Sequence, residues 1–254
     1  MTGRLIFIVM LALLSSFITA CTPPTTVPIG TVCLSGSCEK KNDTLLVFLP
    51  GIHDNPEVYS DKGFIAAAVR NGVKADMIGV DAHIGYYREK KFLVRMKEDV
   101  IEPATRRGYK HIWLVGISLG GFGGIWFDVE NPGEIDGLLS LSPYLGEPEM
   151  IDEVARAGGL QKWQPSGKME LDDQHRIWRG LKNYEFPEKS VGRVYLCYGL
   201  SDKFVLPDSM FAAVLPKEQV FAIEGDHDWP TWRKLWDDLL KKRVFYREGW
   251  SPGP

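Results

Sequence analysis

The chain has 254 residues, of which 44% are hydrophobic and 25% are charged. This composition is that of an ordinary globular protein and excludes an intrinsically disordered chain. The net charge of −3, without a basic stripe interleaved with aromatic residues, argues against nucleic acid as a partner.

The first twenty residues have the layout of a bacterial export signal. Arg4 supplies a positive charge, and residues 5–14 form an apolar run that is short for a transmembrane helix. Residues 18–21 (Ile-Thr-Ala-Cys) resemble a lipobox, the motif at which bacterial lipoproteins are cleaved and acylated on cysteine. The resemblance implies a signal peptide over residues 1–20 and a lipid anchor on Cys21. The alternative is an ordinary secretory signal with an incidental cysteine.

A tether and a small cysteine loop are expected to follow, over residues 21–40. Thr22 stands directly after the cysteine, where Asp would be a retention signal, and this resembles an outer-membrane address facing the periplasm. Residues 22–30 are rich in Pro and Thr and predict an extended tether with no core of its own. Cys33 and Cys38 flank a short loop, and in an oxidising compartment they are predicted to form a disulfide.

From residue 41 to residue 254 the chain alternates between short apolar runs and helix-like segments. Continuous apolar runs are typical of strands that are buried on both faces of a parallel sheet. The predicted strands are residues 45–49, 77–80, 112–115, 137–141, 194–198 and 220–223. The predicted helices are residues 63–71, 92–101, 122–129 and 229–240. The alternation predicts one α/β domain with a mostly parallel sheet flanked by helices.

One connection, residues 146–190, is long and carries aromatic residues among many charges. It is expected to be either a cap or lid inserted between the last strands, or a pair of helices that extends the core. Composition does not separate the two. Cys197 lies within the apolar run 194–198 and is expected to be a small buried hydrophobe.

Residues 116–120 read Gly-Ile-Ser-Leu-Gly and lie between a predicted strand and a predicted helix. A serine on such a tight turn has its hydroxyl exposed at the edge of the sheet. Strand and helix crowd each other on either side, so only glycine is expected to fit at Gly116 and Gly120. The following helix directs its amide groups and positive dipole end at the site. Ser118 is therefore predicted to be a nucleophile; the alternative is a glycine-rich turn with an ordinary serine.

This motif in this context resembles the α/β-hydrolase superfamily, and the resemblance extends over residues 45–240. It implies the α/β-hydrolase fold and a chain order of nucleophile, acid and histidine. Asp202 follows the next-to-last predicted strand, and His227 follows the last one. Residues 227–232 are also similar to the region around the histidine in the esterase-D and feruloyl-esterase branch.

The implied triad is Ser118, His227 and Asp202. The histidine would take the proton of the serine hydroxyl as it attacks an acyl carbon, and the aspartate would hold the imidazole. The resemblance also implies an oxyanion hole formed by the backbone amides of Ile52 and Leu119. Pro50 stands where related enzymes often have His. No cofactor is implied, and no metal is expected because ligand spacings are missing.

Other titratable residues are expected to be mainly structural. His53 and His83 follow early strands on the rim of the predicted nucleophile, where they would contact substrate or support loops. His111 and His175 are expected to be structural or solvated. Asp81 is the substitute candidate for the acid.

The sequence thus predicts a serine hydrolase of carboxylic esters, lipid-anchored in the cell envelope, with a small ester or acyl substrate. A thioesterase, lipase or peptidase of the same fold stays open, since fold does not fix substrate. So does a non-catalytic envelope lipoprotein that uses the fold for binding.

Overall fold

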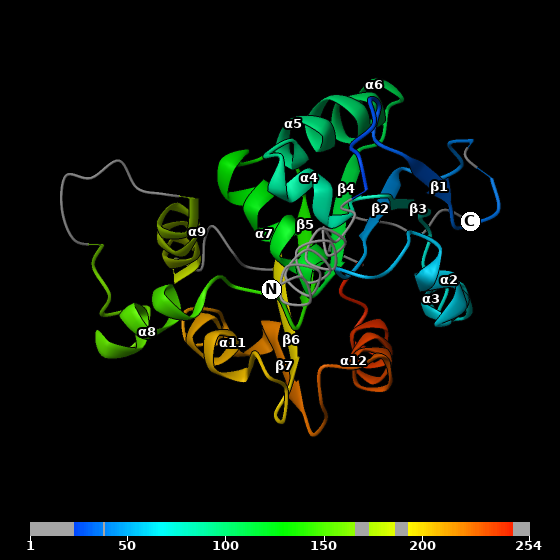
Figure 1. Cartoon of the computed structure of the whole chain (residues 1–254). Helices are drawn as coiled ribbons and strands as arrows, with labels where there is room; N and C mark the ends of the chain where they lie inside the picture. Colours follow the sequence, from blue (N-terminus) through cyan, green and yellow to red (C-terminus); the bar gives the residue numbers. More distant parts are fainter. Residues whose placement is uncertain (1–22, 38, 166–172, 186–192, 246–254) are drawn as a thin grey trace, which may run out of the picture.

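A seven-stranded sheet forms the centre of the protein (Figure 1). The computed structural model describes residues 23–37, 39–165, 173–185 and 193–245. The strand order is β1-β3-β2-β4-β5-β6-β7, with β1 antiparallel to β3 and all other neighbours parallel. The strands are Thr31–Cys33 (β1), Thr44–Leu49 (β2), Asp76–Val80 (β3), His111–Ile117 (β4), Gly137–Leu141 (β5), Val194–Gly199 (β6) and Val220–Ile223 (β7). The six predicted strands and the mostly parallel sheet are confirmed, and β1 is an additional edge strand.

Side chains alternate between the two faces of the sheet, and each face is covered by its own hydrophobic cluster. In β2, Leu46 and Phe48 face one cluster, whereas Leu45, Val47 and Leu49 face the other. All six residues of β2 are buried. Burial on both faces explains why these strands are continuous apolar runs.

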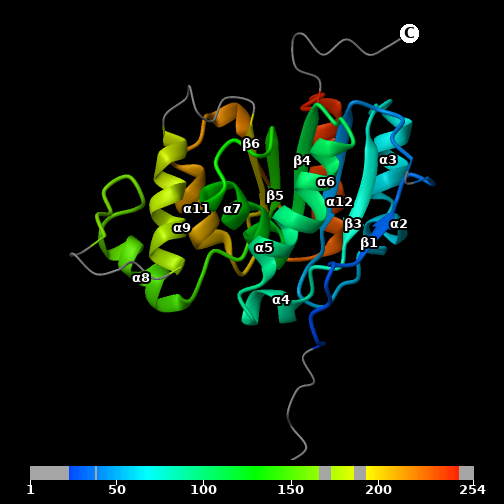
Figure 2. The same cartoon turned by 90° about the horizontal axis from the view of Figure 1, so that it is seen from above.

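Helices cover both faces of the sheet (Figures 1 and 2). One face carries α2 (Val58–Asp61), α3 (Phe64–Arg70) and α12 (Trp229–Lys241). The other carries α4 (Ile84–Arg88), α5 (Phe92–Met96), α6 (Glu102–Arg106), α7 (Leu119–Glu130), α8 (Pro148–Arg156), α9 (Asp173–Lys182) and α11 (Val205–Ala212). The predicted helix 92–101 is α5 followed by a π-helical turn, Lys97–Ile101. Two 3₁₀ turns, Asn183–Glu185 and Lys217–Gln219, complete the described elements.

The direction of the chain along the sheet reverses beside β2. The chain leaves β2 through α2 and α3 on one face to reach β3, and then crosses to β4 on the other side of β2. From β4 it continues into α7 on the opposite face. The carboxyl ends of β2 and β4 are therefore neighbours whose connections diverge, which is where open α/β sheets form a binding crevice.

The described part of the long connection packs into the core. Trp163 and Trp178 are almost fully buried, and the Trp178 indole donates to the carbonyl of Leu145 at 2.7 Å. Tyr184 donates to the buried carboxylate of Asp128 on α7. These contacts extend the core over α7. Whether residues 146–190 open as a lid is a question of motion, and the lid stays a prediction.

The segment predicted to be an extended tether with no core of its own packs against the domain instead. Ile29 is only 3% exposed and belongs to the hydrophobic cluster beside α5. The next residues form β1, in which Cys33 is disulfide-bonded. Its predicted partner Cys38 lies outside the described residues, as does Cys21. Cys197 is a free, fully buried cysteine, as predicted, and burial raises the pKa of its thiol.

Candidate active site

Ser118 occupies a sharp turn between β4 and α7. Its φ of 53° and ψ of −112° lie outside the regions that L-residues readily adopt. Its backbone amide donates to the carbonyl of Leu141 at 2.9 Å, which fixes the turn against β5. Backbone strain of this kind persists only where the surroundings enforce it, and it presents the hydroxyl above the strand end.

Two glycines permit this turn by close backbone approach. A Cβ on Gly116 would lie 2.2 Å from the carbonyl oxygen of Gly120. A Cβ on Gly120 would lie 2.0 Å from the carbonyl oxygen of Leu49, at the end of β2. Any side chain there would push the turn away from the neighbouring strand, so both positions require glycine as the sequence predicts.

The three residues predicted to form the triad are brought together in one hydrogen-bonded chain. The Nε2 atom of His227 lies 3.0 Å from the Oγ atom of Ser118. The Nδ1 atom of His227 lies 3.0 and 2.9 Å from the two carboxylate oxygens of Asp202. The side chain of Asp202 is fully buried, whereas that of His227 is 14% exposed. The hydroxyl, imidazole and carboxylate come from three different strand ends.

Asp202 is held by more than the histidine. The backbone amide of Phe204 donates to its carboxylate at 2.8 Å, and the Ser142 hydroxyl is a further partner. Ser142 in turn accepts a hydrogen bond from the indole of Trp232 at 3.0 Å. Burial raises the pKa of Asp202, but the hydrogen bonds from His227, Phe204 and Ser142 outweigh burial and leave the pKa below its ordinary value. The carboxylate is therefore ionised at neutral pH and fixes the Nδ1–H tautomer of His227.

Sequence reasoning missed Ser142 and Trp232. Trp232 lies in the predicted helix 229–240, and a helical pattern of apolar residues does not distinguish its indole N–H from a core contact. Its ring also packs edge-on against the His227 ring, with centroids 4.9 Å apart. Ser142 follows β5 with a φ of 44°, and that backbone conformation leaves no signal in the sequence.

The oxyanion hole is predicted from the backbone amides of Leu119 and Ile52. Leu119 is the first residue of α7, and Ile52 follows β2 in the neighbouring loop. Within the described residues neither amide donates to a protein acceptor. The loop is shaped by Asp54, whose amide donates to the Gly51 carbonyl at 3.2 Å and whose carboxylate accepts from the Gly51 amide. Burial raises the pKa of Asp54.

A row of aromatic rings leads from His227 to α7 and α4, on the face of the sheet that α7 covers. Phe204 packs edge-on against the His227 ring at 4.9 Å, and Tyr144 follows at 5.7 Å from Phe204. Phe122 lies 5.8 Å from Tyr144, and Tyr87 lies 6.2 Å from Phe122. These side chains are only partly buried, so they offer apolar surface beside the serine.

The other histidines and the substitute acid stand apart from this chain. His83 caps α4 by accepting from the Gly85 amide at 3.1 Å. His111 lies 3.4 Å from Asp136 at the opposite edge of the sheet, and His175 lies 3.2 Å from Glu153 in the long connection. His53 is exposed, and Asp81 has no part in the hydrogen bonds of Ser118 or His227 among the described residues. In the same part of the chain no group of His, Cys, Asp and Glu could hold a metal ion.

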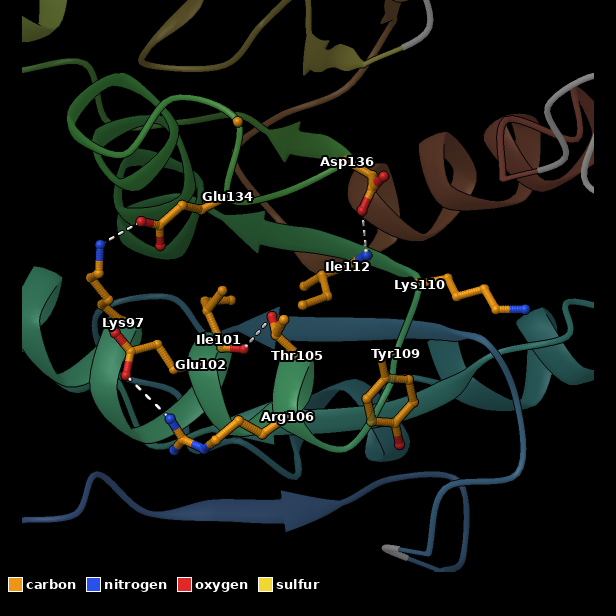
Figure 3. Close-up of a pocket in the computed structure, with 11 residues that line it drawn as sticks. Lys97, Ile101, Glu102, Thr105, Arg106, Tyr109, Lys110, Ile112, Glu134 and Asp136 are labelled. Atoms are coloured by element: carbon orange, nitrogen blue, oxygen red, sulfur yellow. Dashed lines mark hydrogen bonds and ion pairs between the residues drawn. The ribbon is translucent and has the colours of Figure 1, made fainter.

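A separate cavity of about 580 Å³ lies at the opposite edge of the sheet, between α6 and the start of β4 (Figure 3). Its charges neutralise one another: Lys97 pairs with Glu134, and Arg106 pairs with Glu102. It shares no residue with the serine–histidine–aspartate chain.

Several solved structures resemble this chain. An S-formylglutathione hydrolase from Staphylococcus aureus is 16% identical with a TM-score of 0.56, over 82% of this chain and 83% of that one. A monoacylglycerol lipase from Paleococcus ferrophilus is 16% identical with a TM-score of 0.55, over 85% and 98%. MPT51 from Mycobacterium tuberculosis is 14% identical with a TM-score of 0.59, over 88% and 97%.

No protein-family model and no curated protein sequence matches the chain. The structural likeness, together with the sheet order and the strand–turn–helix at Ser118, shows that the chain has the α/β-hydrolase fold.

Proposed function

We propose that the protein is a serine hydrolase that cleaves carboxylic esters through an acyl-enzyme on Ser118. The observation that carries the proposal is the continuous hydrogen-bonded chain from the Ser118 hydroxyl through His227 to the Asp202 carboxylate. A serine hydroxyl is a weak nucleophile until a base takes its proton, and here the base is in contact and oriented. The names of structural neighbours, among them a ferulic acid esterase and a monoacylglycerol lipase, support an ester as the substrate class.

The proposed reaction uses the contacts of this hydrogen-bonded chain. Nε2 of His227 removes the proton of Ser118 as Oγ bonds to the acyl carbon, and the carbonyl oxygen becomes an oxyanion facing the amides of Ile52 and Leu119. The tetrahedral intermediate collapses, and the protonated imidazole gives its proton to the departing alcohol. Water then enters by the same route, releases the acid and restores the serine. Asp202 stabilises the imidazolium in both halves.

The test is hydrolysis of p-nitrophenyl acetate together with labelling by a fluorophosphonate probe. We expect wild-type protein to hydrolyse and to label, and Ser118→Ala to do neither while unfolding at the same temperature. Ser60→Ala, an exposed serine on α2, is the matched control and keeps both activities. Labelling of Ser118→Ala at the wild-type rate would remove this serine from the mechanism.

The non-catalytic alternative is less well supported, because it predicts a serine and histidine out of contact, whereas they lie 3.0 Å apart. A panel of p-nitrophenyl esters of increasing acyl length, run beside a thioester and an anilide, separates esterase from lipase, thioesterase and peptidase.

We also propose that the mature protein is anchored in the cell envelope, in the outer membrane facing the periplasm, by acyl chains on Cys21. The support is the signal-like sequence before Cys21 and the Thr22 that follows it. Among the described helices none is long and apolar enough to cross a bilayer. Metabolic labelling with an alkyne fatty acid tests the anchor: wild-type protein incorporates the label, and Cys21→Ala does not.

A further inference from the structure

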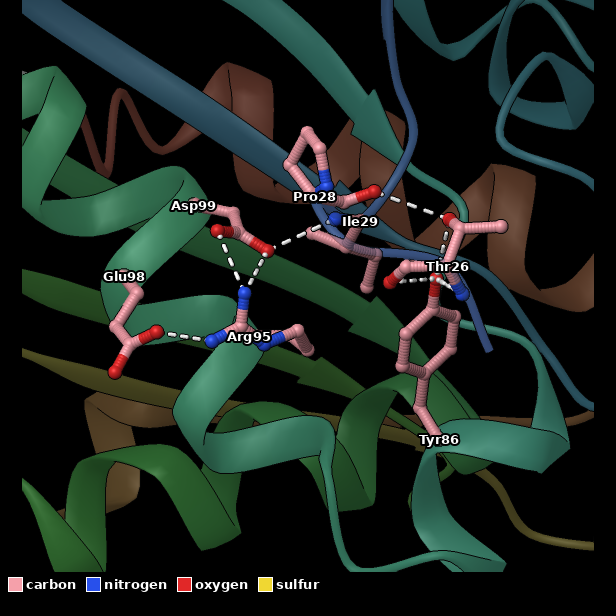
Figure 4. Close-up of polar contacts among 7 residues, drawn as sticks. All are labelled: Thr26, Pro28, Ile29, Tyr86, Arg95, Glu98 and Asp99. Atoms are coloured by element: carbon pink, nitrogen blue, oxygen red, sulfur yellow. Dashed lines mark hydrogen bonds and ion pairs between the residues drawn. The ribbon is translucent and has the colours of Figure 1, made fainter. Parts of the chain in front are cut away.

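The N-terminal segment, residues 23–30, is fastened by backbone hydrogen bonds to α4 and to the π-helical turn that follows α5 (Figure 4). The amide of Thr26 donates to the hydroxyl of Tyr86 at 3.0 Å. The Tyr86 hydroxyl in turn donates to the carbonyl of Thr26 at 3.2 Å. The amide of Ile29 donates to the Asp99 carboxylate at 2.9 Å. Arg95 holds that carboxylate through 2.9 and 3.0 Å contacts.

The contacts continue to the first described residues. The Thr25 hydroxyl donates to Glu89 at 2.8 Å and accepts from Lys91 at 3.0 Å. The carbonyl oxygen of Pro23 lies so close to Gly85 that a Cβ there would approach it to 2.5 Å. The segment is therefore held against the domain from Pro23 onward.

This attachment lies at the carboxyl ends of the parallel strands, the same side of the sheet as Ser118. Helix α4 follows the carboxyl end of β3, which is parallel to β2, and β2 is parallel to β4, which ends at the serine. Tyr87 of α4 belongs to the aromatic row that starts at His227. Figure 2 shows the first coloured residues beside α4 at the lower edge, whereas α12 ends at the upper edge.

The reach from the docked segment to the proposed lipid is short. Pro23 is the second residue after Cys21, and two residues span at most about 7 Å. Acyl chains on Cys21 would therefore hold α4, and with it the carboxyl edge of the sheet, within about one lipid headgroup layer of the bilayer.

Three of the exposed apolar side chains come shortly after the carboxyl ends of β2 and β6. Ile52 follows β2 and is 44% exposed, Leu200 follows β6 and is 46% exposed, and Leu206 in the first turn of α11 is 50% exposed. We call these three residues the apolar rim. Val27 of the docked segment is 72% exposed.

We propose that the docked segment turns the catalytic edge toward the membrane, so that the apolar rim contacts lipid and the substrates are amphiphilic esters held in the bilayer. The proposal rests on the proposed function, including the lipid on Cys21. The occupant of the rim is a lipid surface, because the docked segment begins only two residues after the proposed site of acylation.

The first test measures orientation. Full-length lipidated protein is reconstituted in vesicles of phosphatidylethanolamine and phosphatidylglycerol, with a nitrobenzoxadiazole label on Leu206→Cys or on Lys241→Cys. Lys241 lies at the far end of α12, and its side chain is 70% exposed. We expect spin-labelled lipids to quench the label at position 206 strongly and the label at position 241 weakly. Equal quenching at both positions, or the reverse order, overturns the proposal.

The second test releases the constraint without touching the folded domain. About 20 Gly and Ser residues inserted between Thr22 and Pro23 give a flexible reach of roughly 25 Å while keeping the anchor. We expect hydrolysis of vesicle-embedded 4-methylumbelliferyl palmitate to fall about tenfold, with hydrolysis of dissolved p-nitrophenyl acetate unchanged. An unchanged rate on the embedded ester overturns the proposal.

The controls separate this proposal from the function on which it rests. Absence of p-nitrophenyl acetate hydrolysis in every variant refutes the esterase, and failure of wild-type protein to bind vesicles refutes the anchor. Unlipidated Cys21→Ala protein without vesicles reports on another occupant. Concentration-dependent shielding of the label at position 206 in that protein would assign the rim to a second copy of the chain and overturn the proposal.

Discussion

Replacing Gly120 by alanine tests the geometry of the nucleophile turn directly. The added Cβ would lie 2.0 Å from the Leu49 carbonyl oxygen and 2.7 Å from that of Pro50. The first contact is about 1.4 Å closer than the distance at which ordinary contact begins. Both neighbours are backbone atoms of β2 and its loop, so neither can rotate away. The turn that carries Ser118 must separate from the loop that carries Ile52.

The expected effects follow from that displacement. Overpacking of a tight contact costs about 1–3 kcal/mol of stability. A shift of about 1 Å between reacting groups costs roughly 10²-fold in rate, and loss of one oxyanion donor costs about 10²–10³-fold. We therefore expect kcat/KM for p-nitrophenyl acetate to fall at least about 100-fold in Gly120→Ala, with most of the loss in kcat.

Gly133→Ala is the matched control. Gly133 has a φ of +86°, and a Cβ added there would have no neighbour within 4 Å. Alanine at this position therefore costs about 1–2 kcal/mol of backbone strain without moving the site. Kinetics are measured beside urea unfolding of both variants. A Gly120→Ala enzyme within threefold of wild-type kcat, with the same stability loss as Gly133→Ala, would refute the close approach of turn and loop.

Three further variants probe buried carboxyl groups. The pKa of Asp202 is lowered, so its carboxylate stabilises the fold at pH values above the ordinary pKa of 3.8. Asp202→Asn should therefore lower the stability at pH 7, and the loss should shrink as the pH falls below 3.8. The same variant should lower kcat about 10³–10⁴-fold. A pH-independent loss in urea unfolding would contradict this. Burial raises the pKa of Asp208 well above 3.8, and neither of its oxygens has a partner in the described residues. The free energy that this buried carboxyl group costs the folded state grows as the pH rises above 3.8. Asp208→Asn should therefore be more stable than wild type at pH 7 and equal to it near pH 3. An equal gain in stability at both pH values would count against a protonated carboxyl. Tyr184→Phe removes a hydrogen bond to Asp128, which also accepts from Arg193, and should cost about 1–3 kcal/mol in thermal unfolding with unchanged kcat. A kcat loss would tie this contact to the site.

The strands of the sheet could be predicted because burial on both faces leaves a continuous apolar run. The edge strand β1 could not, since its three residues, Thr31–Cys33, are exposed or half-buried and form no such run. The helix predicted over residues 92–101 was correct in place, but the π-helical turn depends on backbone hydrogen bonding that periodicity does not encode.

The candidate site was predictable where chain order and motif suffice, and the structure brings Ser118, Asp202 and His227 into contact. The residues that support Asp202 and His227 could not be predicted in this way. Trp232 and Ser142 meet across 90 residues of sequence, and that contact depends on how α12 lies against the end of β5.

Docking of the N-terminal segment was hidden for a similar reason. A stretch rich in Pro and Thr has no apolar period, and its partners are the side chains of Tyr86 and Asp99, 60 and 70 residues away. Local composition describes the segment as it would be alone, whereas its conformation is set by distant donors and acceptors.

The separation of 109 residues between Ser118 and His227 has a consequence for biogenesis. His227 reaches the serine only after β7, the last of the described strands and an edge of the sheet, has paired with β6. A chain exported unfolded, as the proposed signal implies, would carry a serine without its base until β7 has paired with β6. Local detachment of this edge strand would separate His227 from Ser118.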